Sequence, residues 1–248
     1  MVAGDRIREL IGRQTKEEEQ AREEAAPTKV AETRVMLQPI AAPSILGLYG
    51  FAGATFIVAA SLAGWFGPIG APLYLFPFAA FFGGLAQFLA GMWAYKARDA
   101  LATAMHGMWG AFWMSYGLLY FLFATGTLTA PTGAFVELGF WFIVLAAITW
   151  MGTWAATAVS GALTSVLGVL AAGSTLMAIA QLIGSPVLTA IAGWVFILSA
   201  VLAWYTASGL MLNSTFGREV LPLGLTKRAK ETPQVNTGVG EPGVIQGQ

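Results

Sequence analysis

Residues 42–213 contain only four charged side chains, and this scarcity constrains the fold more than any other feature of the chain. Three of the four, Lys96, Arg98 and Asp99, lie in one short cluster, and the fourth is Glu137. The surface of a water-soluble domain needs many more charges to remain solvated. A stretch of this length that is apolar and rich in glycine and aromatic residues is therefore expected to lie in a lipid bilayer.

The charged residues outside this stretch exclude several classes of function. Seven of the 13 Lys and Arg residues precede residue 35 and four follow residue 217, interleaved with acidic residues, so no nucleic-acid partner is expected. The chain has no cysteine and one histidine, which leaves no thiolate or multi-histidine metal site, and no motif indicates a cofactor. Membrane-embedded enzymes need paired carboxylates, a Ser/His pair or clustered histidines, so we do not expect an enzyme.

Composition divides the chain into three parts. Residues 1–41 are expected to form a charged cytoplasmic tail and linker, residues 42–216 a transmembrane domain, and residues 217–248 a second cytoplasmic tail that is largely disordered. The N-terminal tail does not resemble a secretory signal, because its first apolar run starts near residue 44.

Six segments are long and apolar enough to cross a hydrocarbon core, which takes about 20 helical residues. The expected spans are residues 44–66, 72–95, 102–125, 133–157, 161–183 and 187–213. The break near Val159–Gly161 is the weakest, because it has neither a charge nor a proline. Without that break the chain would have five spans, and its two tails would lie on opposite sides of the membrane.

The distribution of positive charge favours six spans. With six, both tails and the loop holding Lys96 and Arg98 lie on one side, and the three opposite loops contain no Lys or Arg. Positive residues favour the cytoplasmic side of a membrane. We therefore predict an all-α, multi-pass protein of the plasma or inner membrane, with six transmembrane helices and both termini cytoplasmic.

Small and polar residues recur at helical spacing in several of these spans. Such stripes let helix backbones approach closely in lipid. They comprise Gly47, Gly50 and Gly53; Gly83, Gln87 and Gly91; His106, Gly110, Trp113 and Gly117; and Gly161, Ser165, Gly168 and Ala172. Close packing explains the glycines, but it does not explain Gln87, which either joins two helices or lines a pathway. His106 either relays a proton or stays neutral and hydrogen-bonded, and Glu137 is expected to be solvated.

Three stretches resemble the acetate uptake transporters, the family of the bacterial succinate–acetate permeases and their fungal relatives. Residues 42–48, APSILGL, resemble the signature of the first helix, in which Pro43, Gly47 and Leu48 match. Residues 81–113 resemble the block G-G-x-x-Q…G…Y-K…T-F…S-Y-G-x-F-W, and residues 212–224, LNSTFGREVLPLG, resemble the end of the sixth helix. The chain departs from the family pattern at Ala42, Ile45, His106 and Trp109, the last of which stands where the family usually has Tyr.

The resemblance implies six helices per protomer, a homo-hexameric ring and a pathway through each protomer. It also implies an apolar constriction made by an aromatic of the first helix, an aromatic of the third and a leucine of the fifth. By position these are Phe51, Trp109 and Leu167. From the residues alone, an aromatic in a membrane helix is more often a packing residue.

The leading functional hypothesis is a channel or proton-linked transporter for small monocarboxylates, chiefly acetate, with succinate as a further candidate. The apolar stretch has no Lys or Arg at mid-membrane depth, so an anion would meet only partial positive charges from hydroxyls, amides, indoles and helix N-termini. The alternatives are an exporter of ammonia or ammonium, and a non-transporting membrane sensor or scaffold.

Overall fold

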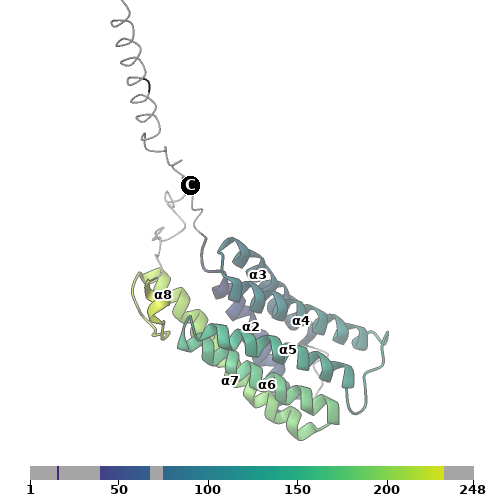
Figure 1. Ribbon diagram of the computed structural model, residues 1–248. Coiled ribbons are helices and arrows are strands. Elements are labelled where there is room, and N and C mark those ends of the chain that lie inside the picture. The colour runs from purple at the N-terminus through teal and green to yellow at the C-terminus, as the bar shows by residue number, and fades with distance from the viewer. Residues whose placement is uncertain (1–15, 17–39, 68–74, 232–248) are drawn as a thin grey trace, which may run out of the picture. The chain divides into compact units, whose positions relative to one another are not determined.

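The computed structural model of the chain describes Lys16, residues 40–67 and residues 75–231. Expectations for the rest of the two tails, and for residues 68–74, lie outside this part of the chain. The described residues form a helical bundle, in which the only β-type pairing is an isolated bridge between Ser160 and Leu225. Its elements are α2 (Pro43–Leu62), the π-helix η2 (Phe78–Leu85), α3 (Ala86–Lys96), α4 (Ala100–Ala124), α5 (Val136–Ala156), α6 (Gly161–Ile183), α7 (Pro186–Phe216) and the short α8 (Lys227–Glu231) (Figure 1).

Helices occupy all six segments that the sequence predicted to be helical. Five of them are long and apolar enough to cross a membrane: α2, the continuous Phe78–Lys96 segment, α5, α6 and α7. The sixth, α4, has 25 residues and no charge, but its histidine, tryptophans and tyrosines lower its mean hydropathy. The membrane protein is thus all-helical and multi-pass, while the sixth span and the side on which the termini lie remain predictions.

The chain does turn at the break that the sequence marked most weakly. Helix α5 ends at Ala156, and Ser160 caps α6 by accepting a hydrogen bond from the backbone N–H of Leu163 at 3.2 Å. Residues that follow α7 return to this turn, where Gly161 N–H donates to the Gly224 carbonyl at 2.9 Å. The break therefore depends on a serine cap and on pairing with residues more than 60 positions away.

The C-terminal segment begins in an ordered conformation. Gly217, in the left-handed conformation (φ 61°), ends α7, and Asn213 then holds the returning chain. Its side-chain oxygen accepts from the N–H groups of Val220 and Leu221, at 2.6 and 3.0 Å, and its amide donates to the Leu221 carbonyl at 2.9 Å. Residues 217–226, assigned to a largely disordered tail from the sequence, are therefore held against the bundle and are followed by α8, while the prediction of disorder for residues 232–248 lies outside the described residues.

Glycines bring the second and third spans into close contact, as their spacing predicted. A Cβ added to Gly91 would lie 2.6 Å from the backbone nitrogen of Gly107, and one added to Gly117 would lie 2.6 Å from Ala80 Cβ. Neither position has room for a larger side chain. The predicted stripe on α6 is different, because Gly161 and Gly168 have no such close neighbour. The tight approach on α6 is at Gly173, which lies against Phe196 of α7.

The second span starts with a π-helical segment. Helix η2 begins after Pro77 and runs directly into α3. Wide π-helical turns are rare and are frequently found at functional sites. Here Gln87, in the first turn of α3, donates through Nε2 to the Gly83 carbonyl at 2.9 Å. Gly83 in turn lies against Ala54 and the Trp113 ring, so this segment helps to position residues near the centre of the bundle.

Candidate functional site

Two cavities lie along the centre of the bundle, one toward each end. The larger has a volume of about 550 Å³ and extends to the loop before α5 and to the α6–α7 turn. The smaller has a volume of about 50 Å³ and lies toward the end that holds Ser44, Asp99 and Val159. A single water needs roughly 10–15 Å³ of such volume, so the smaller cavity admits a few waters or one small molecule. We call these the outer and inner cavities, after the predicted orientation.

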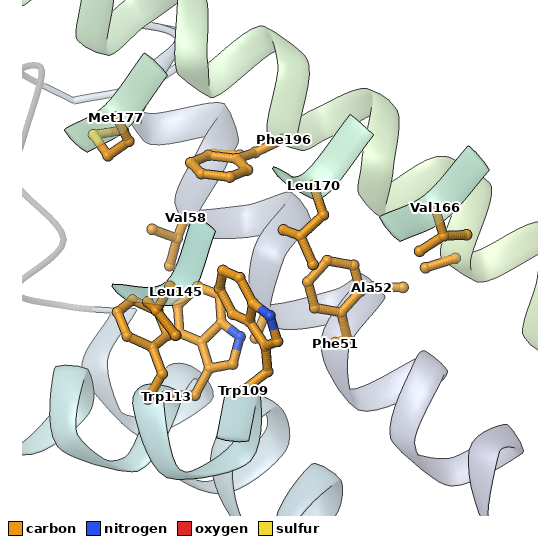
Figure 2. Close-up of a cluster of buried hydrophobic side chains, with 14 of the residues drawn as sticks. Phe51, Ala52, Val58, Trp109, Trp113, Leu145, Val166, Leu170, Met177 and Phe196 are labelled. Atoms are coloured by element: carbon orange, nitrogen blue, oxygen red, sulfur yellow. The ribbon is translucent and has the colours of Figure 1, made fainter. Parts of the chain in front are cut away.

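Trp109 and Leu170 line both cavities and therefore separate them. Phe51 lines the inner cavity alone and lies against this boundary: its ring meets that of Trp109 edge-on, with the ring centroids 6.1 Å apart and the planes at 73°. All three side chains are buried, with exposed fractions of 3%, 2% and 3% for Trp109, Leu170 and Phe51. Figure 2 shows Phe51 and Trp109 side by side, with Leu170 extending toward them from α6. We call this group the neck.

Trp109 is held in place by a buried polar contact with α5. Its indole N–H donates to the Thr149 hydroxyl at 3.0 Å, and that hydroxyl donates to the Leu145 carbonyl at 2.6 Å. The Phe112 ring, 5.3 Å from Trp109 between centroids, supports the indole from its own helix. A tryptophan fixed in this way presents a rigid apolar surface at the neck, because its one polar atom is already satisfied.

All three predicted constriction residues line the inner cavity, but only Trp109 of the three also lines the outer one. Leu167 is buried and lines the inner cavity alone. Leu170, three residues later on α6, reaches both cavities. The helical period explains how sequence reasoning could select either leucine, since residues three apart lie on the same face of a helix.

The polar candidates of the sequence analysis gather at the inner cavity. Gln87 and His106 both line it and are both buried, and Asp99 lines it at the start of α4. The Asp99 side chain also caps α4, by accepting from the Ala102 N–H at 2.9 Å. The inner cavity thus has a carboxylate, an imidazole and an amide on the approach to the neck.

The signature residues of the first helix help to shape the same region. Pro43 occupies the first turn of α2, where a missing backbone N–H costs nothing. Leu48 lines the inner cavity. Gly47 faces His106, and a Cβ at this position would overlap the imidazole ring. The lack of a side chain at Gly47 therefore leaves the space that the His106 ring occupies.

The cavities offer a ligand little formal charge. Among the described residues that line either cavity, Asp99 is the only charged one. Within residues 40–67 and 75–231, no group of three or more His, Cys, Asp or Glu side chains could hold a metal ion. The outer cavity is instead bordered by aromatic rings, hydroxyls, Gln181 and the N-terminal turn of α7 at Ser185 and Pro186. A small solute would meet apolar surface and neutral hydrogen-bonding groups.

Four residues at this centre were not singled out as site residues from the sequence. They are Leu170, Thr149, Thr55 and Trp113. A sequence signal existed for the last two, because Thr55 is four residues after Phe51 and Trp113 is four residues after Trp109, which places each on the same helix face as a neck aromatic. No comparable signal marked Thr149, whose role depends on the packing of α5 against α4.

Comparison with known proteins agrees with this architecture. A sequence model of the GPR1/FUN34/yaaH family matches residues 26–224. A solved structure entitled "Structure of the bacterial acetate channel SatP" superposes with a TM-score of 0.69 and 28% sequence identity, and the match covers 75% of this chain and all of the other.

Two curated relatives carry different functional names. The succinate-acetate/proton symporter SatP of Escherichia coli is 32% identical over 187 residues, which is 75% of this chain and 96% of that protein. Ammonia transport outward protein 2 of Saccharomyces cerevisiae is 31% identical over 172 residues, which is 66% of this chain and 59% of that protein.

Proposed function

The chain belongs to the GPR1/FUN34/yaaH family, and we propose that it carries acetate and other small monocarboxylates across the cell membrane through the path marked by its two cavities. The observation that carries this proposal is the neck. Two cavities approach each other from opposite ends of one bundle and share Trp109 and Leu170 at their boundary, where the Phe51 ring packs against Trp109 from the inner side. The likeness to the SatP symporter and the acetate channel supports the choice of solute.

The neck accounts for selection by size and hydration. A constriction lined by apolar side chains excludes hydrated ions and empties of water when it closes. Acetate has one methyl group and one carboxyl group, so its protonated form can lose its water at such a neck at a lower cost than a metal ion. Succinate, with a second carboxyl group, should pass less readily.

The absence of a cationic side chain among the described cavity-lining residues favours the neutral acid as the species that enters the neck. An unpaired charge at the centre of a membrane costs at least about 2.5–3.5 kcal/mol. Uptake of acetate is therefore expected to rise as the external pH falls. If His106 relays the proton, His106→Ala will shift this pH profile; an unchanged profile leaves His106 a packing residue beside Gly47.

Export of ammonia or ammonium is the second candidate, and the yeast relative is the observation that favours it. Ammonium carries only hydrogen-bond donors and ammonia has a single acceptor lone pair, whereas the buried Trp113 indole N–H and the Thr55 hydroxyl both lack a partner among the described residues. Carboxyl oxygens supply such acceptors, and this difference makes acetate the better match.

We also propose that the protein works as a ring of six copies, with both termini in the cytoplasm and one path through each copy. Many aromatic and aliphatic side chains are exposed on the isolated protomer, among them Phe140 and Trp154 on α5 and Trp194 and Trp204 on α7. Lipid and neighbouring copies would cover such surfaces. Native mass spectrometry in a mild detergent tests the assembly, and a monomer as the sole species would overturn it.

Uptake of radiolabelled acetate into vesicles containing only this protein tests the function. We expect uptake above that of protein-free vesicles, rising from about pH 8 to about pH 5, a range through which the free acid becomes more abundant. Competition with unlabelled succinate and ammonium separates the candidates. Acetate uptake equal to that of protein-free vesicles at every pH would eliminate acetate transport and leave ammonia export and the scaffold as the remaining hypotheses.

A further inference from the structure

Two polar atoms at the inner end of the outer cavity have no hydrogen-bond partner among the residues that the structure describes. They are the hydroxyl oxygen of Thr55 on α2 and the indole nitrogen of Trp113 on α4. Both side chains line the outer cavity, and both are buried, with exposed fractions of 4%. Leaving a buried polar group without a partner costs free energy, so such groups in a folded protein call for an explanation.

The unpaired state of Thr55 is unusual for this bundle. Buried hydroxyls on neighbouring helices donate to the carbonyl four residues earlier, as Thr149 does to Leu145 at 2.6 Å and Ser174 does to Leu170 at 2.8 Å. The Thr55 hydroxyl could donate to the Phe51 carbonyl in the same way, yet it has no partner among the described residues. Similarly, the indole of Trp109 is paired with Thr149, whereas that of Trp113 is unpaired.

The two unpaired groups each lie one helical turn from a neck aromatic. Thr55 follows Phe51 by one helical turn on α2, and Trp113 follows Trp109 by one turn on α4. Phe51 and Trp109 are in edge contact and both of their i+4 neighbours line the outer cavity, so we infer that Thr55 and Trp113 face the same part of that cavity. Gly83 of η2 lies against the Trp113 ring and leaves space for it.

We propose that Thr55 and Trp113 form a carboxyl-binding subsite, at which a small monocarboxylate waits before it crosses the neck. This inference rests on the proposed transport function. An indole N–H can only donate a hydrogen bond and a hydroxyl can donate one as well, so together they suit the oxygens of one carboxyl group. The neighbouring apolar side chains, Val58 and Phe196 among them, suit the alkyl end of the ligand.

Both polar atoms are enclosed by protein in the empty structure. A carboxyl group therefore reaches them only when the surrounding side chains part, for example by rotation of Thr55 about its Cα–Cβ bond. Binding would then repay the cost of the unpaired donors. The subsite thus couples arrival of the ligand to a rearrangement directly beside the neck.

The test uses the full-length protein with Thr55→Val and Trp113→Phe, singly and together. Each change removes the donor and keeps most of the side-chain volume. Because its hydroxyl is unpaired when the site is empty, Thr55→Val should not lower the thermal stability of the ligand-free protein; Trp113→Phe also removes buried ring atoms, so its readout is the change that acetate produces relative to the same variant without acetate. The matched controls are Thr206→Val, whose buried hydroxyl is paired with the Leu202 carbonyl, and Trp150→Phe, whose exposed indole is paired with Thr175.

Two readouts are needed, acetate uptake into vesicles and stabilisation of the detergent-purified protein by acetate relative to chloride. We expect each single variant to raise the KM for acetate by about three- to tenfold, the effect typical of one hydrogen bond. The double variant should lose most of the stabilisation by acetate, while the controls keep both properties. An unchanged KM and unchanged acetate stabilisation in a double variant that is folded and monodisperse would overturn the subsite. If the wild-type protein itself takes up no acetate, it is the proposed function that fails.

Discussion

The indole nitrogen of Trp109 lies 3.0 Å from the hydroxyl of Thr149, and this contact ties the neck to α5. Thr149 is fully buried and uses its own proton to bond Leu145 at 2.6 Å, so the indole is its donor partner. The rigidity of the neck therefore depends on a helix that contributes none of the three neck side chains.

Thr149→Val should destabilise the protein and loosen the neck. The change removes the acceptor and leaves the Trp109 N–H buried and unpaired, which costs about 1–3 kcal/mol. The measurement is the thermal midpoint of the purified protein together with the flux of acetate per folded protein. Thr175→Val is the matched control, because Thr175 accepts from Trp150 in the same way, at 3.3 Å, but at an exposed site. Equal losses in the two variants would contradict the special role of Thr149.

Phe51→Ala should widen the neck and admit larger solutes. The succinate-to-acetate uptake ratio per folded protein is expected to rise, because one wall of the constriction is removed. If Phe51 only fills space, the variant will lose about 3–5 kcal/mol of stability, as in soluble cores, and its selectivity will be that of the wild type. Phe140→Ala, an aromatic truncation on α5 away from the neck, is the control and should leave the uptake ratio unchanged.

Leu170→Ala and Leu167→Ala form a matched pair that identifies the third neck residue. Both leucines are buried on α6, so both truncations should cost a similar amount, about 2–5 kcal/mol. Only Leu170 lines both cavities, and so only its truncation should join them and raise acetate flux per folded protein. A larger rise for Leu167→Ala would return the constriction to the position first predicted from the family resemblance.

Gly47→Ala should displace the His106 ring and destabilise the protein by about 1–3 kcal/mol, the usual cost of overpacking. Removing the ring should relieve the clash. The double variant Gly47→Ala/His106→Ala should therefore lose less stability than the sum of the losses in the two single variants. A thermodynamic double-mutant cycle in detergent measures this coupling. Gly107→Ala is the control, since a Cβ there meets no atom within 4 Å. Strict additivity would contradict the direct contact.

Single cysteines can test the orientation, because the chain has none of its own. A cysteine replacing Thr129 should react with an impermeant maleimide added to intact cells. Cysteines replacing Ala97 or Ser214 should react only after the membrane is permeabilised. All three positions are exposed on the protomer, so lack of labelling would not follow from burial. Labelling of position 97 from outside would reverse the predicted topology.

Much of the fold could be predicted from the sequence because apolar length and glycine spacing are local properties. The expected span 161–183 coincides with α6, and the other predicted spans agree with their helices to within a few residues wherever the structure describes them. The stripe containing Gly83, Gln87 and Gly91 predicted a packed face that the structure confirms. The π-helical start of the second span was not predicted, since no local pattern distinguishes it from an α-helix.

The candidate site was only partly predictable. The sequence by itself determined that the chain needs a lipid environment, that Phe51 shares a helix face with Gly47, and that a histidine and a glutamine lie among apolar residues. Tertiary structure decided which of these meet: it brought Gln87, His106 and Asp99 to one cavity and Phe51, Trp109 and Leu170 to the boundary between two. It also left Thr55 and Trp113 without partners while it paired Trp109 with Thr149. The reason is physical: helical periodicity sets which residues share a face, but whether a donor on that face finds an acceptor depends on the neighbouring helix, its distance and its rotation.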